Sequence, residues 1–305
     1  MIKFKSLIDL LIALPNEQDC INYLEKYRWN GKAISPFDPT SKVYKCKNNR
    51  YKCKNTNKYF NVKIGTIFEN SKISLQKWFW VLFDFSSKKK GISSHQLTRE
   101  LDITQKTAWF MLNRIRYTFD QPSFIKEMLK GVVEIDEMFI GGKNKNRHWN
   151  KKIPKSQGRS CKDKIPVWGA IERGGFLIAE AVPNNQQSTL VPIVRDNIKE
   201  SSDVYSDELP AYEILGKWYN HEIVNHKAKQ YVNGKVSTNT IESAWAPFKR
   251  SVYGIYHWIS KKHAQRYVDE ITFRFNTRKY EEKDRFDLVL SSSIGKRLTY
   301  QQLIN

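Results

Sequence analysis

The feature that most constrains the fold is an abrupt change of pattern near residue 131. Before that point most apolar residues follow helical spacing. The runs GVVEIDEMFIGG (131–142), IPVWGAIERGG (165–175) and FLIAEAVPN (176–184) are instead typical of strands. Helical and strand patterns then alternate, so residues 131–280 predict the order β-β-β-α-β-α-β-α-α. Such an order requires a sheet covered by helices, and the whole chain predicts an α+β or α/β multidomain protein.

The region before this sheet predicts three smaller parts, and one short part follows it. Residues 1–31 predict N-terminal helices, and residues 32–70 predict a small β-meander in which Lys and Arg alternate with Tyr and Phe. Residues 71–125 predict a helical region. We expect the sheet domain to occupy 126–285 and residues 286–305 to form a C-terminal tail.

Two helical stretches around a turn at Asp102 predict a helix-turn-helix. The second helix begins with polar residues, of which Lys106 and Thr107 are candidates for contacting base edges in a major groove. An ordinary helical hairpin is the alternative interpretation.

The charge of the chain predicts a polyanionic partner. It has 52 Lys and Arg against 31 Asp and Glu, a net charge of +21. Nucleic acid is therefore the expected partner. No apolar run is long enough for a membrane span and no lipid-anchor motif occurs, so we expect no membrane and a cytoplasmic location. The four cysteines are scattered, which fits a reducing compartment.

Three acids stand in positions suited to phosphodiester chemistry. Asp136 ends the apolar run GVVEID, Asp207 ends SSDVYSD, and Glu242 lies in the predicted helix of STNTIESAW. Carboxylates fixed at strand ends and on a helix can hold two Mg²⁺ or Mn²⁺ ions about 4 Å apart, the arrangement that supports strand cleavage. Each acid also has a structural alternative: Asp136 as a turn residue, Asp207 as the residue that starts the Ser206–Pro210 turn and caps the helix after it, and Glu242 as part of a capping box with Asn239.

Basic residues accompany these acids. Lys249 follows Glu242 by seven residues, which is two helical turns and roughly 10 Å along the helix axis, and Arg250 stands beside it. Residues 143–164 hold nine Lys or Arg and one acid, which favours a loop that orders on a nucleic-acid backbone over a merely solvated loop. The candidates for DNA contact in this loop are Lys143, Lys145, Arg147, Lys151 and Lys152.

Several of these motifs, in this order, resemble one family. The runs VVEIDEMFIGG, VWGAIER, VYSDELPAY and TNTIESAWAPFKRSVYGIYHW are similar to those of bacterial insertion-sequence transposases of the DDE type, and YKCKNTNKYFNVKIGTIFE resembles their N-terminal region. The resemblance covers roughly residues 30–280. It implies an N-terminal zinc ribbon, a helix-turn-helix and an RNase-H-like catalytic domain.

The resemblance also implies an activity and its residues. It implies a transposase that cuts one strand at each element end and transfers the new 3′-OH to target DNA. Asp136, Asp207 and Glu242 match the acidic triad and Lys249 the accompanying base, with Asn239 as a reserve third ligand because some relatives use Asn there. Two ends must be held together, so a homodimer or larger assembly on DNA is expected.

One departure from the family concerns zinc. The family's ribbon uses two CxxC pairs, but here the first reads Ser35-Pro36-Phe37-Asp38 and the second Cys53-Lys54-Asn55-Thr56. A single thiolate and a carboxylate do not make the closed tetrahedral site that structural zinc prefers. We therefore expect a ribbon-like β-fold without zinc.

Two other functions compete with a transposase. The first is a catalytically inactive or repurposed sequence-specific DNA-binding protein, which the lost cysteines favour and the intact acids oppose. The second is an RNase-H-like nuclease acting on RNA–DNA hybrids, which would not need a helix-turn-helix.

Overall fold

The computed structural model describes residues 4–119, 127–142, 144–154, 156, 160–224 and 236–305. The chain divides into two compact units, one formed by residues 1–118 with 280–305 and the other by residues 119–279. Among the described residues, no helix is long and apolar enough to cross a membrane. The mixed α/β character predicted from the sequence is confirmed.

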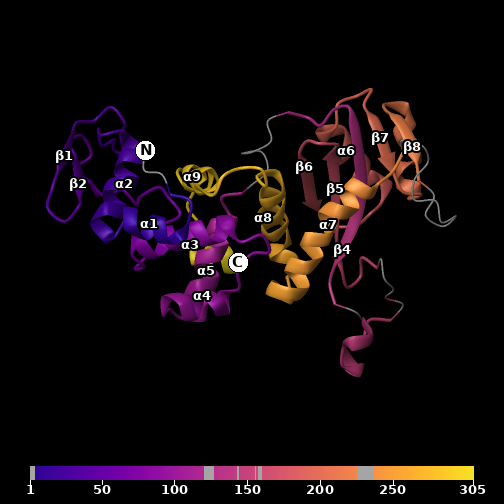
Figure 1. Ribbon diagram of the computed structural model, residues 1–305, viewed down its shortest axis with the longest axis horizontal. Helices are drawn as coiled ribbons and strands as arrows, with labels where there is room; N and C mark the ends of the chain where they lie inside the picture. Colours follow the sequence, from indigo (N-terminus) through magenta and orange to yellow (C-terminus); the bar gives the residue numbers. More distant parts are fainter. Residues whose placement is uncertain (1–3, 120–126, 143, 155, 157–159, 225–235) are drawn as a thin grey trace. The chain divides into compact units, whose positions relative to one another are not determined.

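The first unit combines a small sheet with helices from both ends of the chain (Figure 1). Its sheet has the order β1-β2-β3, all antiparallel, with the strands Val43–Lys45, Tyr51–Cys53 and Tyr59–Phe60. Its helices are α1 (Leu7–Ala13), α2 (Glu17–Trp29), α3 (Leu75–Ser87), α4 (Ser94–Leu101), α5 (Gln105–Arg116), α9 (Glu282–Ser292) and α10 (Tyr300–Ile304). Most of these helices start at a Ser, Thr or Asn whose side chain accepts a backbone N–H of the first turn, which satisfies donors that the helix itself leaves open.

Helices α4 and α5 form where the sequence predicted two helices around a turn. Asp102 ends α4 in the left-handed conformation, and Thr104 caps α5 through a bond from the Thr107 N–H. Leu97 and Leu101 of α4 and the apolar face of α5 are buried. The rest of α5 is also covered, since every residue from 111 to 116 is buried. The exposed residues of α5, Gln105 and Lys106, therefore lie in its first turn, and Trp109 and Phe110 are partly exposed.

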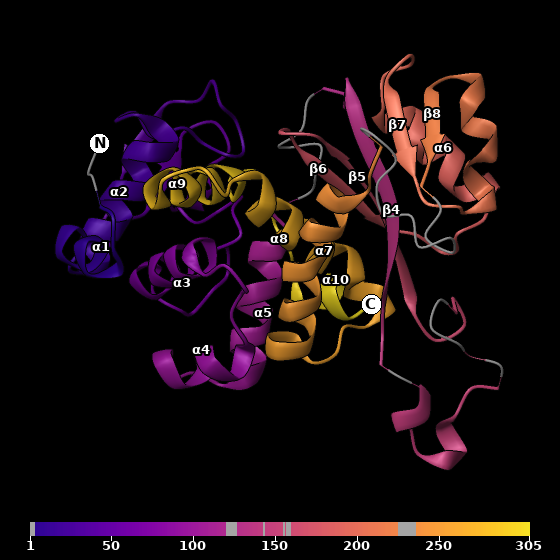
Figure 2. The ribbon, with the colours of Figure 1, turned by 45° about the vertical axis from the view of Figure 1, so that its right-hand side comes forward.

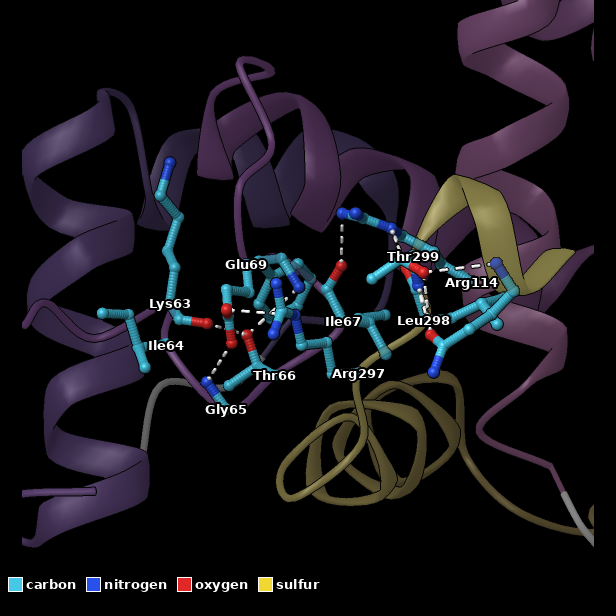
Figure 3. Close-up of polar contacts among 12 residues, drawn as sticks. Lys63, Ile64, Gly65, Thr66, Ile67, Glu69, Arg114, Arg297, Leu298 and Thr299 are labelled. Atoms are coloured by element: carbon cyan, nitrogen blue, oxygen red, sulfur yellow. Dashed lines mark hydrogen bonds and ion pairs between the residues drawn. The ribbon is translucent and has the colours of Figure 1, made fainter. Parts of the chain in front are cut away.

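The C-terminal segment, which we expected to be a tail over residues 286–305, belongs to the first unit. Ile294 pairs with Thr66, and the Gly295 N–H donates to the Gly65 carbonyl at 2.8 Å. Arg114 of α5 donates to the carbonyls of Ile67 at 2.8 Å and Leu298 at 3.1 Å (Figure 3). This segment thus links residues 65–67 to α5, and the unit is completed only by the end of the chain.

The second unit is built on a five-stranded mixed sheet of order β6-β5-β4-β7-β8. Strands β4 and β5 are antiparallel, as are β5 and β6, whereas β4 runs parallel to β7 and β7 to β8. The strands are β4 (Val132–Ile140), β5 (Ile165–Glu172), β6 (Leu177–Ala181), β7 (Asp203–Ser206) and β8 (Asn220–Ile223). The α-helices are α6 (Gln187–Asn197), α7 (Asn239–Ser251) and α8 (Ala264–Asn276); 3₁₀ turns cover Asn144–Asn146 (η2), Trp149–Lys151 (η3), Pro210–Lys217 (η4) and Lys261–His263 (η7), and a π-helical turn covers Val252–Tyr256 (η6).

Helices cover both faces of this sheet (Figure 2). Even-numbered residues of β4, such as Met138, pack with α7 and α8, and odd-numbered residues, such as Ile135, pack with α6 and η4. This alternation follows from the two-residue period of a strand. The even face of β4 therefore looks toward α7, and Glu134 and Asp136 belong to it.

Candidate acid site on β4, β7 and α7

Asp136 lies within a strand, which corrects the expectation that it ends one. Strand β4 continues four residues beyond it to Ile140, and Asp136 faces Gly169 across the β4–β5 ladder. The side chain is only partly exposed, on the face that packs with α7. Asp136 is held by the β4–β5 ladder, and two residues earlier β4 is also paired with β7 at Glu134, so the backbone that carries this carboxylate is well fixed.

Asp207 follows β7 directly. The parallel register pairs Val132 with Asp203 and Glu134 with Tyr205, so continuing it by two residues brings Asp207 level with Asp136. Asp207 is 4% exposed, and its Oδ1 accepts the N–H of Leu209 at 3.1 Å. The residue thus forms the turn after the strand, but it does not cap η4, whose N-cap is Leu209 without a side-chain bond.

Glu242 lies in the first turn of α7, with an exposed side chain. The helix is capped at Thr238 rather than at Asn239, which is the first helical residue, and the Thr238 hydroxyl donates to Glu242 Oε1 at 3.4 Å. The capping box proposed for Asn239 and Glu242 is therefore not formed.

The other two acids act electrostatically on Asp136. Burial and the carboxylate of Asp207 raise the pKa of Asp136 to about 7, and the carboxylate of Glu242 adds to the rise. The N–H of Glu137 and the indole of Trp245, whose Nε1–H donates to Asp136 Oδ2 at 3.0 Å, act in the opposite direction. The ionised form of Asp136 is therefore destabilised by burial and by the accumulation of like charge around it, beyond what its hydrogen bonds compensate.

This accumulation fits a hard divalent cation. Carboxylate oxygens are the ligands that Mg²⁺ and Mn²⁺ prefer, and a cation would relieve the repulsion among the three groups. As they stand, the side chains of the described residues include no group of three or more His, Cys, Asp or Glu positioned to hold a metal ion. A cation would therefore have to draw Asp207 and the exposed Glu242 closer to Asp136.

Glu134 is a residue of this site that the sequence analysis missed. It is fully buried, and its Oε2 accepts the backbone N–H groups of Thr240 at 2.8 Å and Ile241 at 3.0 Å. Its Oε1 accepts the Thr240 hydroxyl at 2.9 Å and Arg173 Nε at 2.7 Å. Since Thr238 makes no side-chain cap, Glu134 satisfies the open donors at the start of α7 and places a negative charge at the positive end of the helix.

One strand thus fixes the helix and presents the central acid. Glu134 and Asp136 are two residues apart on the same face of β4. The strand that holds the start of α7 therefore also carries Asp136, whose pKa the carboxylate of Glu242 helps to raise. Trp245, one turn further along α7, packs over Gly169, where an added Cβ would come within 2.4 Å of the indole. Only glycine at position 169 allows this approach of α7 to the sheet.

The remaining candidates on α7 lie further along the helix. Lys249 and Arg250 are in its last turn and both are exposed, and the helix runs through Pro247 to Ser251. Asn239 is exposed at its first turn.

The basic loop after β4 is described in part. Lys143 lies outside the described residues, whereas Lys145, Lys151 and Lys152 are exposed. Arg147 forms an ion pair with the buried Asp163 at 3.6 Å. The loop contains two 3₁₀ turns, and its Trp149 is 86% exposed.

The candidates on α5 lie in its first turn. Lys106 is exposed and its ammonium stands 4.6 Å from the centroid of the Tyr300 ring, while the Thr107 hydroxyl bonds that of Thr104. No signal in the sequence linked Lys106 to the C-terminal helix, because that contact joins residues almost two hundred positions apart.

The β-meander places hydroxyl groups around its buried cysteine. Cys53 is buried, which raises the pKa of its thiol, but the neighbouring hydroxyl groups of Ser35, Ser41 and Thr56 outweigh burial and lower the pKa to about 6. Ser35 Oγ accepts the N–H groups of Phe37 and Asp38 at 3.2 and 3.3 Å. Ser35 and Thr56, at two of the positions where the family has cysteines, thus surround the remaining thiol.

Comparison with known proteins places this chain among the transposases. It belongs to the ISXO2-like transposase family, whose transposase domain matches residues 128–276. This match spans the sheet and helices that carry the acid site, and it confirms the family resemblance seen in the sequence motifs.

Two relatives have related descriptions. The chain is 27% identical to an uncharacterized protein in transposable element ISH50 of Halobacterium salinarum, over 92% of this chain and 97% of the relative. It is 34% identical to an uncharacterized transposase-like protein of Haemophilus influenzae, over 31% of this chain and 76% of the relative. Among solved structures, a chain of the Mos1 strand transfer complex is similar with a TM-score of 0.27 and 13% identity, over 70% of this chain and 77% of that one.

Proposed function

We propose that the protein is a DNA transposase that cuts one strand at each end of its element and joins the new 3′-OH to target DNA. Asp136, Asp207 and Glu242 would hold two Mg²⁺ or Mn²⁺ ions. The observation that supports this most directly is the raised pKa of Asp136, which burial and the carboxylates of Asp207 and Glu242 bring to about 7. The five-stranded mixed sheet with helices on both faces is compatible with the RNase-H-like fold that we propose for this unit.

The chain's own residues would position the reaction. Glu134 fixes the start of α7 on β4, and the Trp245 indole orients the Asp136 carboxylate. Divalent ions, when bound, supply an acidified water and stabilise the charge on the phosphate and on the leaving oxygen. Lys249 would neutralise an adjacent phosphate, and catalysis would rest on positioning and charge stabilisation. Asn239 is the reserve third ligand.

DNA would be held by several basic regions. We assign the α4–α5 pair as a helix-turn-helix, with Lys106 and Thr107 at the open first turn of α5. The loop after β4 would contact DNA through Lys145, Arg147, Lys151 and Lys152, and α7 through Arg250. Because two ends must be joined, we propose a homodimer or larger assembly on double-stranded DNA, and no structural zinc.

Strand cleavage of a plasmid that carries the two ends of the element tests this function. Wild-type protein with Mg²⁺ or Mn²⁺ should release 3′-OH ends and form target joints, whereas Asp136→Ala should lose at least ~10³-fold of the rate while binding the same DNA. Equal cleavage by wild type and Asp136→Ala would refute a catalytic role for the acids.

Two further outcomes would identify the alternative functions. Binding of the element ends without cleavage under any divalent cation would favour a repurposed DNA-binding protein. Cleavage of RNA–DNA hybrids without any preference for element ends would favour a nuclease. Separately, Glu242→Gln should abolish cleavage, and Asn239→Ala should not; the reverse result would make Asn239 the third ligand.

A further inference from the structure

The small sheet of the first unit has two chemically different faces. Tyr51, Cys53 and Phe60 are buried on the inner face. On the outer face the strand register aligns Tyr44 with Lys52 and Lys52 with Tyr59, which forms one row across all three strands. Tyr44 is 43% exposed and Tyr59 is 49% exposed. We define the outer face by this row and the two cations beside it, Lys42 and Arg50.

The cations of the outer face stand over its rings. The Lys42 ammonium is 5.4 Å from the centroid of Tyr44, and Arg50 and Lys52 are 5.0 and 5.8 Å from that of Tyr59. Contacts of this kind attract a cation to the ring face. They restrict long side chains that would otherwise be mobile, so three positive charges are held in place before any partner arrives.

No acid neutralises these charges. Residues 39–63 contain eight Lys or Arg and no Asp or Glu. Within the part of the chain that the structure describes, none of Lys42, Arg50 and Lys52 forms an ion pair with a carboxylate. Three unneutralised cations ordered on one exposed face suit an anionic partner whose charges are spaced along a surface.

We propose that the outer face binds the phosphate backbone of duplex DNA. The cations occupy the ring faces on which an unpaired base would stack, so the surface suits phosphates better than single-stranded bases. Phosphate contacts fix register and orientation without reading sequence. This inference rests on the proposed function only in taking duplex DNA as the substrate, and it adds a sequence-independent clamp outside the α4–α5 pair.

The salt dependence of DNA binding tests this assignment. Binding of full-length protein to a short mixed-sequence duplex, and to one of its strands, is measured by fluorescence anisotropy in EDTA between ~50 and ~200 mM salt. The test variant is Lys42→Gln/Arg50→Gln/Lys52→Gln. The matched control is Lys72→Gln/Lys89→Gln/Lys90→Gln, which removes the same charge from exposed positions in the same unit. Thermal unfolding followed by circular dichroism verifies that both variants are folded.

The test variant should lose at least ~10-fold in duplex affinity, and the slope of log K against log salt should become shallower by about 2 to 3, since each lost phosphate contact contributes about 0.9. The control should change the slope by less than about 1. Equal slopes for the two variants would overturn the proposal. It would also be overturned if Tyr44→Leu/Tyr59→Leu abolished single-strand binding while the charge variant retained it, because the face would then stack bases.

The omission of divalent ions separates this result from the proposed catalysis. Asp136→Ala should bind the duplex with the wild-type salt slope, so loss of cleavage leaves the measurement intact. Conversely, an unaltered salt slope in the outer-face variant would refute DNA binding by the outer face without bearing on cleavage by the three acids.

Discussion

At the scale of single residues, the site is organised by two carboxylates of opposite character on one strand. Glu134 is buried with a full set of hydrogen-bond donors, whereas Asp136 is crowded by Asp207 and Glu242 and has a raised pKa. The first group fixes structure because its charge is compensated. The second is available to a cation because its charge is not.

The raised pKa of Asp136 predicts a characteristic dependence of stability on pH. A carboxyl whose pKa rises from about 4 in the unfolded chain to about 7 in the fold binds its proton more tightly when folded. Its contribution to stability is therefore present below pH 4 and is lost as the pH rises to about 7. Without divalent cations, the free energy of unfolding of the second unit should fall across this window, and Mg²⁺ should restore it most above pH 7.

Asp207→Asn tests the cause of this dependence. Removing the neighbouring charge lowers the pKa of Asp136, so the fall in stability should be smaller and complete at lower pH. Urea unfolding at several pH values, with and without Mg²⁺, measures both effects. A wild type and an Asp207→Asn variant with the same pH profile would show that Asp207 does not act on Asp136.

Glu134→Gln should separate positioning from chemistry. The amide NH₂ of Gln would face the N–H groups of Thr240, Ile241 or Arg173, which are also donors. Hydrogen bonds would be lost, so the variant should lose about 2–4 kcal/mol of stability. At temperatures where it is still folded, it should bind Mn²⁺ about 10–100-fold more weakly, because the start of α7 and therefore Glu242 would no longer be fixed. Titration calorimetry measures this affinity. Glu222→Gln, an exposed acid on β8, is the matched control and should change neither quantity; unchanged Mn²⁺ affinity in Glu134→Gln would contradict the positioning role.

At the scale of elements, the order of strands and helices in 131–280 followed from periodicity because each element has one strongly apolar face. The end of β4 was misplaced since Asp136 interrupts an apolar run, yet Met138 and Ile140 continue the same alternation beyond it. The burial of Glu134 could not be predicted, because its partners Thr240 and Ile241 lie more than a hundred residues away. Periodicity reports the faces of an element, not the distant groups that meet them.

The lowered pKa of Cys53 predicts how the stability of the β-meander depends on pH. The Cys53 thiol has a pKa of about 6 against an ordinary value near 9, so its thiolate is stabilised by the fold. A lowered pKa contributes stability that is full above pH 9 and is lost as the pH falls to about 6. The free energy of unfolding of the first unit should therefore increase as the pH rises from about 6 to 9. Cys53→Val should remove this increase.

Metal content provides the second measurement on this element. EDTA should leave the unfolding of the wild-type first unit unchanged, and elemental analysis should find no stoichiometric zinc. Ser35→Cys/Asp38→Cys/Thr56→Cys supplies three further thiols around Cys53 and should create a zinc site that makes stability sensitive to EDTA. One tightly bound zinc per wild-type chain would contradict the expectation that this element folds without zinc.

At the scale of the whole molecule, the chain leaves the first unit at residue 118, builds the second, and returns at residue 280. The sequence suggested a tail after residue 285 because the last segment has weak apolar patterning of its own. Hydrogen bonds to distant residues hold this part of the chain instead: Arg285 donates to the Ser86 carbonyl, and the Tyr23 hydroxyl donates to Asp287. A discontinuous unit is not visible in local patterns, since its two parts are separated by an entire domain.

This discontinuity predicts that the end of the chain stabilises the first unit, and not the second unit, which directly precedes it in the sequence. Deletion of residues 294–305 removes the Leu298 carbonyl from Arg114, whose pKa burial lowers to about 10, and leaves a guanidinium in the core with one carbonyl fewer. It also removes Arg297, whose Nε lies 3.0 Å from Glu69 Oε1 (Figure 3). Hydrogen–deuterium exchange should therefore rise in residues 63–69 and in α5, while the strands of the second unit keep their protection. Gln301→Ala, an exposed position on α10, should leave both patterns unchanged. Increased exchange in β4 and β5 together with α5 would show instead that the two units unfold as one, because a segment that stabilises only the first unit cannot protect a sheet with its own core.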